Sequence, residues 1–219
     1  YTNSINWSKQ LDKLFSSVDF KSSVSGNQRY SITTLKTSLV PEPLFDKETI
    51  PATLGLGGTE SDNFQFEQLA DRKVFGVNAL PDIVANLFEH PPTNSFVKWL
   101  NTLDNSEKPT GHICVLDKEF ILVISDENEF KIVNTFSFTK GDDILFYLLS
   151  ALESIEVLHS NLSLTLWGEI EKGGSIHKLL AKYIGTISFG TRPKNLSYGY
   201  SLNKLNEHRF PFIFSVLCE

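Results

Sequence analysis

The second half of the sequence contains a regular series of strand and helix patterns, and this series restricts the fold more than any other feature. Short apolar segments separated by tight polar turns predict an antiparallel meander of three strands, after which helix and strand patterns alternate. The predicted order is therefore β-β-β-α-β-α-β. In chain order, the predicted elements are strands at 112–116, 120–125 and 130–138, a helix at 142–152, a strand at 162–167, a helix at 175–183 and a strand at 186–189.

The first half is less regular. β-Branched residues at 29–40 predict a strand or a hairpin, which Pro41 and Pro43 end because proline cannot donate to a strand ladder. Residues 73–79 predict another strand, and the glycines of 51–63 predict a mobile loop.

Two amphipathic patterns in this half, at 7–18 and 81–88, predict helices. The polar segment 105–111 contains both a proline and a glycine, so it is the predicted boundary between the irregular and the regular half.

Composition excludes several classes of protein. The 20 Lys and Arg residues against 26 Asp and Glu residues give a net charge of −6, which argues against a nucleic-acid partner. The apolar run 144–149 is far shorter than the roughly 18–20 residues that span a bilayer, so we expect no membrane insertion. Only Cys114 and Cys218 are present, without a disulfide framework, which favours a reducing compartment and a cytoplasmic location.

Several short motifs are spread over nearly the whole chain. They are Thr-Ser-Leu-Val-Pro-Glu-Pro-Leu-Phe-Asp at 37–46, Val-Asn-Thr-Phe-Ser-Phe at 133–138, the segment 142–149, Arg192-Pro193 with Tyr198-Gly199-Tyr200, and Leu-Cys-Glu at 217–219. Together with the order of elements, they resemble a family of uncharacterised Bacteroidetes proteins with an actin-like ATPase fold. That family is similar to the cytoplasmic actin-like modules of type II secretion and pilus-assembly systems, and no activity is established for it.

The resemblance implies an α/β protein made of two ribonuclease H-like lobes, each with a mixed five-stranded sheet and flanking helices. Residues 1–105 would form the first lobe, which is degraded or lacks its opening strands in this sequence. Residues 110–219 would form the second lobe.

The resemblance also places a candidate nucleotide site. Actin-like ATPases hold phosphates with a hairpin turn that contains an aspartate and a glycine, because glycine lets backbone N–H groups approach the phosphate oxygens. The matching turn here contains Asp117 and Lys118 but no glycine, and Glu119 adds negative charge. Gly168 and Glu169 match the adenosine side, but a glycine that ends a strand at this point is also explained by ordinary turn chemistry, which we favour. Mg-ATP is the cofactor that such a site would take, although the missing glycine favours a chain that binds none.

No catalytic or metal-binding residue is predicted. A ribonuclease H-type nuclease needs carboxylates that converge from its strands, but the strand at 112–116 contains none. The acidic residues near the expected site, Asp117, Asp142, Asp143, Glu169 and Glu171, lie at turns and element ends. The five histidines show no metal-ligand spacing.

We therefore favour a catalytically inactive module that acts as a scaffold or interaction partner for another protein. Most aromatic residues of the last stretch, 198–214, are expected in the core, where they bury large areas. If several are exposed together, Tyr198, Tyr200 and Phe212 are the candidate partner-binding surface, because aromatic side chains dominate protein interfaces. An ATP-binding protein or weak ATPase that uses the cleft between the lobes is the alternative. An RNA-associated factor is a lower alternative, against which the net acidity counts.

Overall fold

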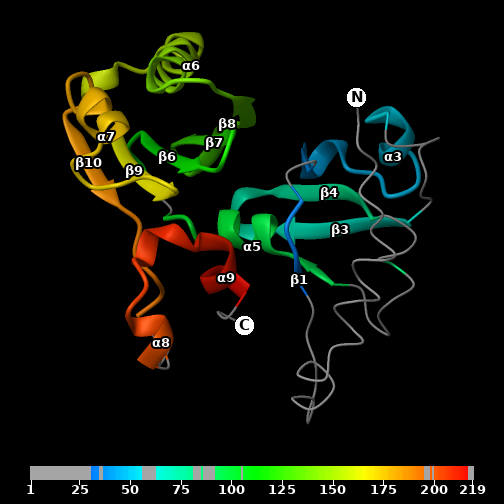
Figure 1. Cartoon of the computed structure of the whole chain (residues 1–219). Coiled ribbons are helices and arrows are strands. Elements are labelled where there is room, and N and C mark those ends of the chain that lie inside the picture. Colours follow the sequence, from blue (N-terminus) through cyan, green and yellow to red (C-terminus); the bar gives the residue numbers. More distant parts are fainter. Residues whose placement is uncertain are drawn as a thin grey trace.

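The computed structural model of this protein describes residues 31–34, 37–55, 63–80, 85, 92–104, 106–194, 198 and 200–216. These residues form a five-stranded sheet in the second half of the chain, and a three-stranded sheet with a short two-stranded pair in the first half. Figure 1 shows the two larger sheets on opposite sides of the molecule, with helix α5 (Ser95–Thr102) between them. The predicted helices at 7–18 and 81–88 lie outside the described residues, apart from Ala85.

The five-stranded sheet confirms the element order predicted from the sequence. Strand β6 pairs antiparallel with β7, which pairs antiparallel with β8, and β6 also pairs parallel with β9, which pairs parallel with β10. The order across the sheet is β10-β9-β6-β7-β8. The strands are β6 (Thr110–Val115), β7 (Glu119–Asp126), β8 (Glu129–Ser137), β9 (Ser163–Gly168) and β10 (Thr186–Phe189).

One face of this sheet packs against α6 (Gly141–Ser154) and α7 (Ser175–Leu180). Side chains at alternate positions of the strands, such as Ile113 and Leu122, form the core with Ile144 and Leu148 of α6. Because the apolar residues between Ile144 and Leu152 leave almost no polar face, the sequence suggests that α6 is fully buried. That expectation is wrong, since Phe146 is 64% exposed on the outer side of the helix.

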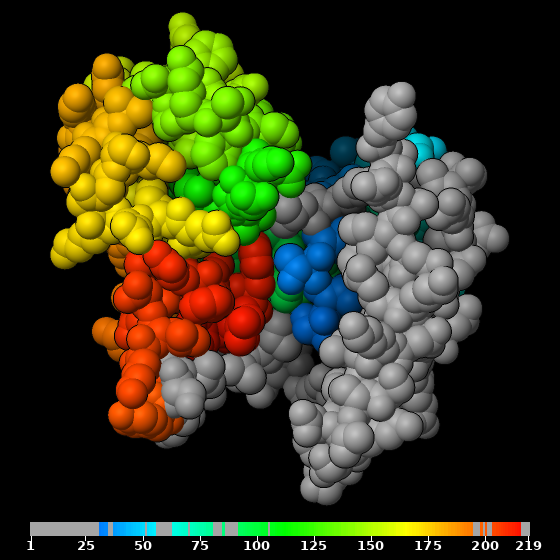
Figure 2. Space-filling model, in the orientation of Figure 1, coloured from blue at the N-terminus to red at the C-terminus, as the bar shows by residue number. Residues whose placement is uncertain are grey.

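The opposite face of the sheet packs against α5 and α9 (Pro211–Val216). Trp99 of α5 is only 1% exposed and makes edge-to-face ring contacts with Trp167 of β9 and Phe212 of α9. The same core cluster includes Leu69 from the first half of the chain, so α5 is packed against both halves. Figure 2 shows the C-terminal residues, in red, lying directly against the half of the chain that contains the five-stranded sheet.

The first half is built around strand β4 (Val74–Leu80), which confirms the strand predicted at 73–79. It pairs antiparallel with β2 (Ser38–Pro41) on one side and with β3 (Asn63–Leu69) on the other. The prediction of a hairpin within 29–40 is wrong, because β1 (Ser31–Ile32) pairs instead with β5 (Thr93–Asn94), in parallel.

Two further details differ from expectation in this half. The sequence analysis missed β3, although Phe64 and Phe66 alternate with polar residues there. The segment predicted as a mobile loop begins with a short helix, α3 (Ile50–Thr53), and its last residue, Asn63, already belongs to β3.

The remaining elements are short. They are the 3₁₀ turns η1 (Glu42–Leu44), η2 (Ala70–Arg72), η3 (His159–Asn161) and η4 (Glu207–Arg209), and the helix α8 (Tyr200–Asn203). Within the part of the chain that the structure describes, no helix combines the length and apolar character needed to cross a membrane.

Candidate functional site

The fold brings the four predicted nucleotide-site residues to one edge of the five-stranded sheet. Asp117 and Lys118 form the turn between β6 and β7, and Gly168 ends β9 with Glu169 after it. The parallel pairing of β6 with β9 places Val115, two residues before Asp117, opposite Gly168. Asp117, Lys118 and Glu169 are exposed. The four residues that the resemblance placed in one candidate site therefore do lie near one another.

The turn itself is closed by its own backbone. The N–H of Leu116 donates to the carbonyl of Glu119 at 2.8 Å, and the N–H of Phe138 donates to the carbonyl of Lys118 at 3.0 Å. Neither Asp117 nor Lys118 adopts the left-handed backbone conformation. A phosphate-binding nest needs successive N–H groups turned toward one point by such a conformation, and this turn does not provide it.

Gly168 is required by packing within the chain. Its φ is +80°, and a Cβ atom placed on it would lie 2.1 Å from the carbonyl oxygen of Val115. The next residue, Glu169, donates its N–H to the same carbonyl at 2.7 Å. The space beside Gly168 is therefore filled by backbone of the chain itself, which explains the glycine without a ligand.

The three candidate partner-binding aromatics do not form one surface. Phe212 packs into the core cluster around Trp99. Tyr198 is half-buried, donates its hydroxyl to the carbonyl of Pro193 at 2.9 Å and contacts the ring of Phe214. Only Tyr200 is strongly exposed, at 76%, with the Lys204 ammonium 4.2 Å from its ring centroid.

The acidic residues near the expected site have structural roles of their own. The Asp143 carboxylate accepts backbone N–H bonds from Thr139 at 2.8 Å and Lys140 at 3.1 Å, and these bonds lower its pKa. Glu171 pairs with Arg209 at 3.2 Å. Among the described residues, no three His, Cys, Asp or Glu side chains gather where they could hold a metal ion.

Cys114 offers no nucleophile. It is buried in the sheet, and this burial raises the pKa of its thiol to about 12. The thiol therefore stays protonated at neutral pH, and the thiolate is the reactive form of cysteine.

The sequence analysis missed a cavity of about 580 Å³ on the α5 side of the sheet. Its walls come from the end of α5, from β6, β9 and β10, from the segment 190–194 and from α9. Pocket-lining residues of this kind are drawn together by the fold from distant parts of the chain. The cavity beside α5 shares no lining residue with the shallower depression around Asp117 and Lys118.

His112 is the buried titratable residue in the wall of this cavity. It is 5% exposed, and burial, together with the positive charge of Arg72 nearby, lowers its pKa to about 4. The Trp167 indole N–H donates to its Nδ1 at 3.3 Å. His112 is therefore neutral at physiological pH, with its proton on Nε2.

Known structures place the chain in a class of proteins with an actin-like ATPase fold. A protein from Bacteroides thetaiotaomicron, described as having this fold and unknown function, is similar with a TM-score of 0.71 and 15% sequence identity, over 100% of this chain and 84% of that one. A chain of the PilM-PilN type IV pilus biogenesis complex is similar with a TM-score of 0.56 and 13% identity, over 88% and 80%. The expected actin-like ATPase fold is thus confirmed. Among the described residues, the second half has the expected mixed five-stranded sheet, whereas the first half has a three-stranded sheet and a two-stranded pair in place of one.

Within that class, the chain belongs to the family described as protein of unknown function DUF3822, which residues 1–187 match. No curated protein matches the chain significantly.

The packing of Gly168 predicts a large effect of a single added methyl group. Gly168→Ala should lower the free energy of unfolding by about 1–3 kcal/mol more than Gly173→Ala, because overpacking against Val115 adds to the strain of a positive φ. Gly173 is a matched control, since its φ is also +80° but nothing lies within 4 Å of the added atom. Urea denaturation of both variants measures the difference, and equal losses would contradict this account of Gly168.

The low pKa of His112 predicts how stability depends on pH. Between pH 6.5 and about 4 the unfolded chain binds more protons at His112 than the folded chain, so the free energy of unfolding should fall as the pH falls through this window. The loss from this residue is on the order of 3 kcal/mol.

Urea denaturation between pH 7.5 and 4 measures this dependence. His112→Gln should flatten it, whereas the same change at the exposed His159 should leave the dependence as it is. An unchanged profile in His112→Gln would show that His112 is not the group responsible.

Proposed function

We propose that this chain is a catalytically inactive actin-like module that acts in the cytoplasm by binding another protein. The observation that carries the proposal is the state of the expected phosphate-binding edge. The turn at Asp117 and Lys118 lacks glycine, and the space beside Gly168 is filled by the Val115 carbonyl.

The chemistry of nucleotide binding explains why this observation matters. Phosphate oxygens in such a site are bound by backbone N–H groups that approach them closely. Here the N–H groups of Leu116 and Glu169 both donate to carbonyls of the chain, to those of Glu119 and Val115. The exposed carboxylates of Glu119 and Glu169 would also repel a phosphate.

Two observations support a protein partner. The similar PilM chain comes from a complex with PilN, so a chain of this fold does act in a protein assembly. The exposed large apolar side chains of this molecule include Tyr200, Leu205 and Ile213, all within or near the C-terminal helices α8 and α9. Figure 1 shows α8 projecting away from the five-stranded sheet. A partner that covers Tyr200 would bury apolar area that the chain alone leaves in water.

The cytoplasmic location is supported by the cysteines. Cys114 is buried and unpaired, as expected in a reducing compartment.

One observation favours ATP binding as a second candidate function. Asp117, Lys118, Gly168 and Glu169 lie at one edge of the sheet, where an actin-like ATPase would hold its nucleotide. The experiment that tests the first proposal also tests this alternative.

Thermal unfolding with saturating Mg-ATP or Mg-ADP should leave the unfolding midpoint unchanged. A ligand at about 100 times its dissociation constant adds about 2.7 kcal/mol to stability, which raises the midpoint by about 5–10 °C in a chain of this size. Mg²⁺ without nucleotide is the control. A rise of that size which Asp117→Ala abolishes would establish the nucleotide-binding alternative, and ATP turnover that Asp117→Ala abolishes would refute the inactive module.

Site-specific crosslinking tests the protein-binding half of the proposal. A photo-crosslinking phenylalanine in place of Tyr200 should yield a covalent adduct of defined mass with a cellular protein. Leu44, which is comparably exposed at 69% but lies in the first half of the chain, is the control position and should yield no adduct of that mass. The same adducts at both positions, or none at Tyr200, would contradict a partner surface at α8.

A further inference from the structure

The cavity beside α5 has a polar floor on the five-stranded sheet. His112 of β6 lies opposite Thr165 of β9, which lies opposite Ser188 of β10, so the three side chains form one row on the same face. The hydroxyls of Thr165 and Ser188 are hydrogen-bonded to each other at 3.1 Å. All three residues line the cavity. Polar side chains on a sheet face that is otherwise packed with apolar residues need a polar group to hydrogen-bond with.

Two buried N–H groups in the cavity wall have no acceptor. They are the indole N–H of Trp99 and the Nε2–H of His112. An indole N–H can only donate, so Nδ1 of His112 is the acceptor of the bond from Trp167 and carries no proton. The proton of the neutral ring is therefore on Nε2, which has no hydrogen-bond partner. An unsatisfied buried donor destabilises the folded chain. Both residues are more than nine-tenths buried, so solvent does not remove this cost.

Arg72 adds positive charge next to the same wall. It is 6% exposed and donates through Nη2 to the carbonyls of Leu103 at 3.2 Å and Asp104 at 2.9 Å, two residues that line the cavity. Its guanidinium carbon lies 4.6 Å from the ring centroid of Phe130, and its Nη1 has no partner. The charges of Asp71 and Asp104 partly offset that of Arg72 without an ion pair to its guanidinium, so its surroundings keep a positive potential.

Further unpaired polar groups adjoin Arg72. Thr110 and Ser125 lie opposite each other on β6 and β7, and Ser125 lies opposite Phe130, over which Arg72 is placed. The hydroxyls of both residues are buried without a partner. The unpaired groups at this end of the sheet are thus N–H donors and hydroxyls, which also donate.

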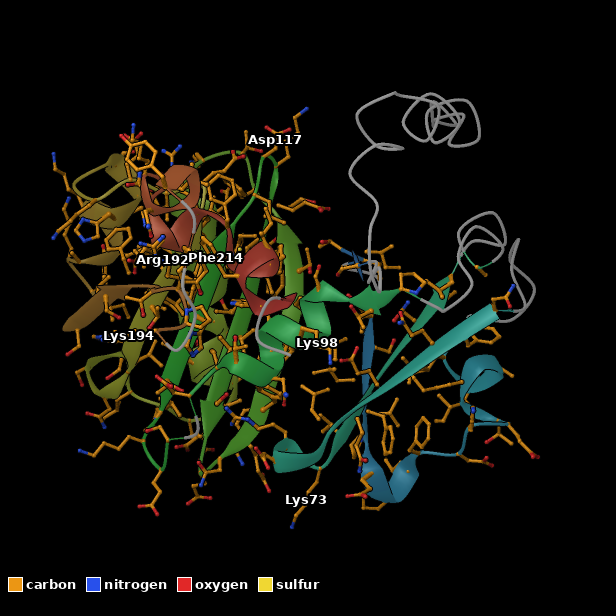
Figure 3. The ribbon with its side chains drawn as sticks, turned by 90° about the horizontal axis from the view of Figure 1, so that it is seen from below. Lys73, Lys98, Asp117, Arg192, Lys194 and Phe214 are labelled. Atoms are coloured by element: carbon orange, nitrogen blue, oxygen red, sulfur yellow. The ribbon has the colours of Figure 1, made fainter. Side chains whose placement is uncertain are left out.

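The charged residues at the cavity are mainly basic, in a chain whose net charge is −6. Lys194 is exposed at the cavity, and Arg192, which pairs with Glu207 at 3.4 Å, lines it as well. Asp104 is the acidic lining residue. In Figure 3, Arg192, Lys194 and Phe214 lie apart from Asp117, so this basic region is separate from the candidate nucleotide edge.

Much of the remaining wall is apolar and aromatic, although Thr102, Thr191 and Ser215 also line it, and the volume of about 580 Å³ is within the usual range of small-molecule sites, about 300–1,000 Å³. The apolar lining residues include Trp99, Trp167, Phe189, Pro193, Pro211 and Phe214. Aromatic walls with a few convergent donors are typical of a site for a small molecule that has an apolar body and one polar group.

From these observations we propose that the cavity binds a small organic anion, a carboxylate with an apolar body. Its carboxylate accepts hydrogen bonds from His112 and Trp99 and is attracted by Arg72 and Lys194, while its body packs against the aromatic wall. Both N–H groups are screened from solvent, so binding includes a small adjustment of these two rings. The hydrogen bonds that the two buried donors gain favour this adjustment.

Benzoate and benzamide are probes that test this proposal, because they have the same shape and differ in charge. The indole N–H signals of Trp99 and Trp167 in ¹H–¹⁵N NMR spectra of the full chain report on the cavity directly. Benzoate should shift the Trp99 signal saturably, and benzamide should bind about tenfold more weakly, since hydrogen bonds to a charged acceptor are stronger. Equal affinities, or no saturable shift with benzoate, would overturn the proposal.

Two variants and one further probe complete the test. His112→Phe should abolish the shift, and Lys194→Glu should weaken benzoate binding severalfold, whereas Lys182→Glu, at an exposed position outside the cavity, should not. Lys194→Glu decides the matter if His112→Phe does not fold, because Lys194 is exposed. Inorganic phosphate that binds as tightly as benzoate would show a simple anion site and overturn the assignment to organic acids.

Discussion

The burial of α5 between the two halves of the chain is the interaction on which the rest of the structure depends. Trp99 contacts β9 through Trp167 and α9 through Phe212, and the surrounding cluster extends to Leu69 of the first half. Arg72 adds a polar link, because it starts from the first half and donates to the carbonyls at the end of α5. Helices α5 and α9 cover only part of one face of the five-stranded sheet. The cavity, with the polar row of His112, Thr165 and Ser188 on its floor, lies beside them.

The second half of the fold was predictable because its signals are local. Strands of alternating or continuous apolar residues, separated by two- to four-residue polar turns, define β6, β7 and β8 within the sequence itself. The pairing of β1 with β5 joins residues more than 60 positions apart, and no local pattern encodes it. Phe64 and Phe66 alternate with polar residues in β3, but the glycine-rich segment before this strand predicts a loop, so the strand was not predicted.

The candidate nucleotide site and the cavity around His112 also differ in whether local sequence patterns reveal them. The resemblance placed Asp117 and Gly168 in one candidate site because each lies in a short motif at a strand end. The cavity around His112 draws its lining from separate elements, and its members become neighbours only when the sheet and α5 are assembled. The available signal was a histidine inside an apolar strand, with Thr165 and Ser188 at inward positions of two later strands. Without the strand register, nothing connects these three residues.

The hydrogen bond between Glu169 and Val115 bears on how such a chain could change during evolution. Substitution of Lys118 by glycine would give the β6–β7 turn its backbone freedom, but the Val115 carbonyl would still occupy the space beside Gly168. A phosphate beside Gly168 would require the ends of β6 and β9 to separate as well. Such a separation loses sheet hydrogen bonds before any ligand contact compensates for them. A single substitution in the turn would therefore not open this end of the sheet to a ligand.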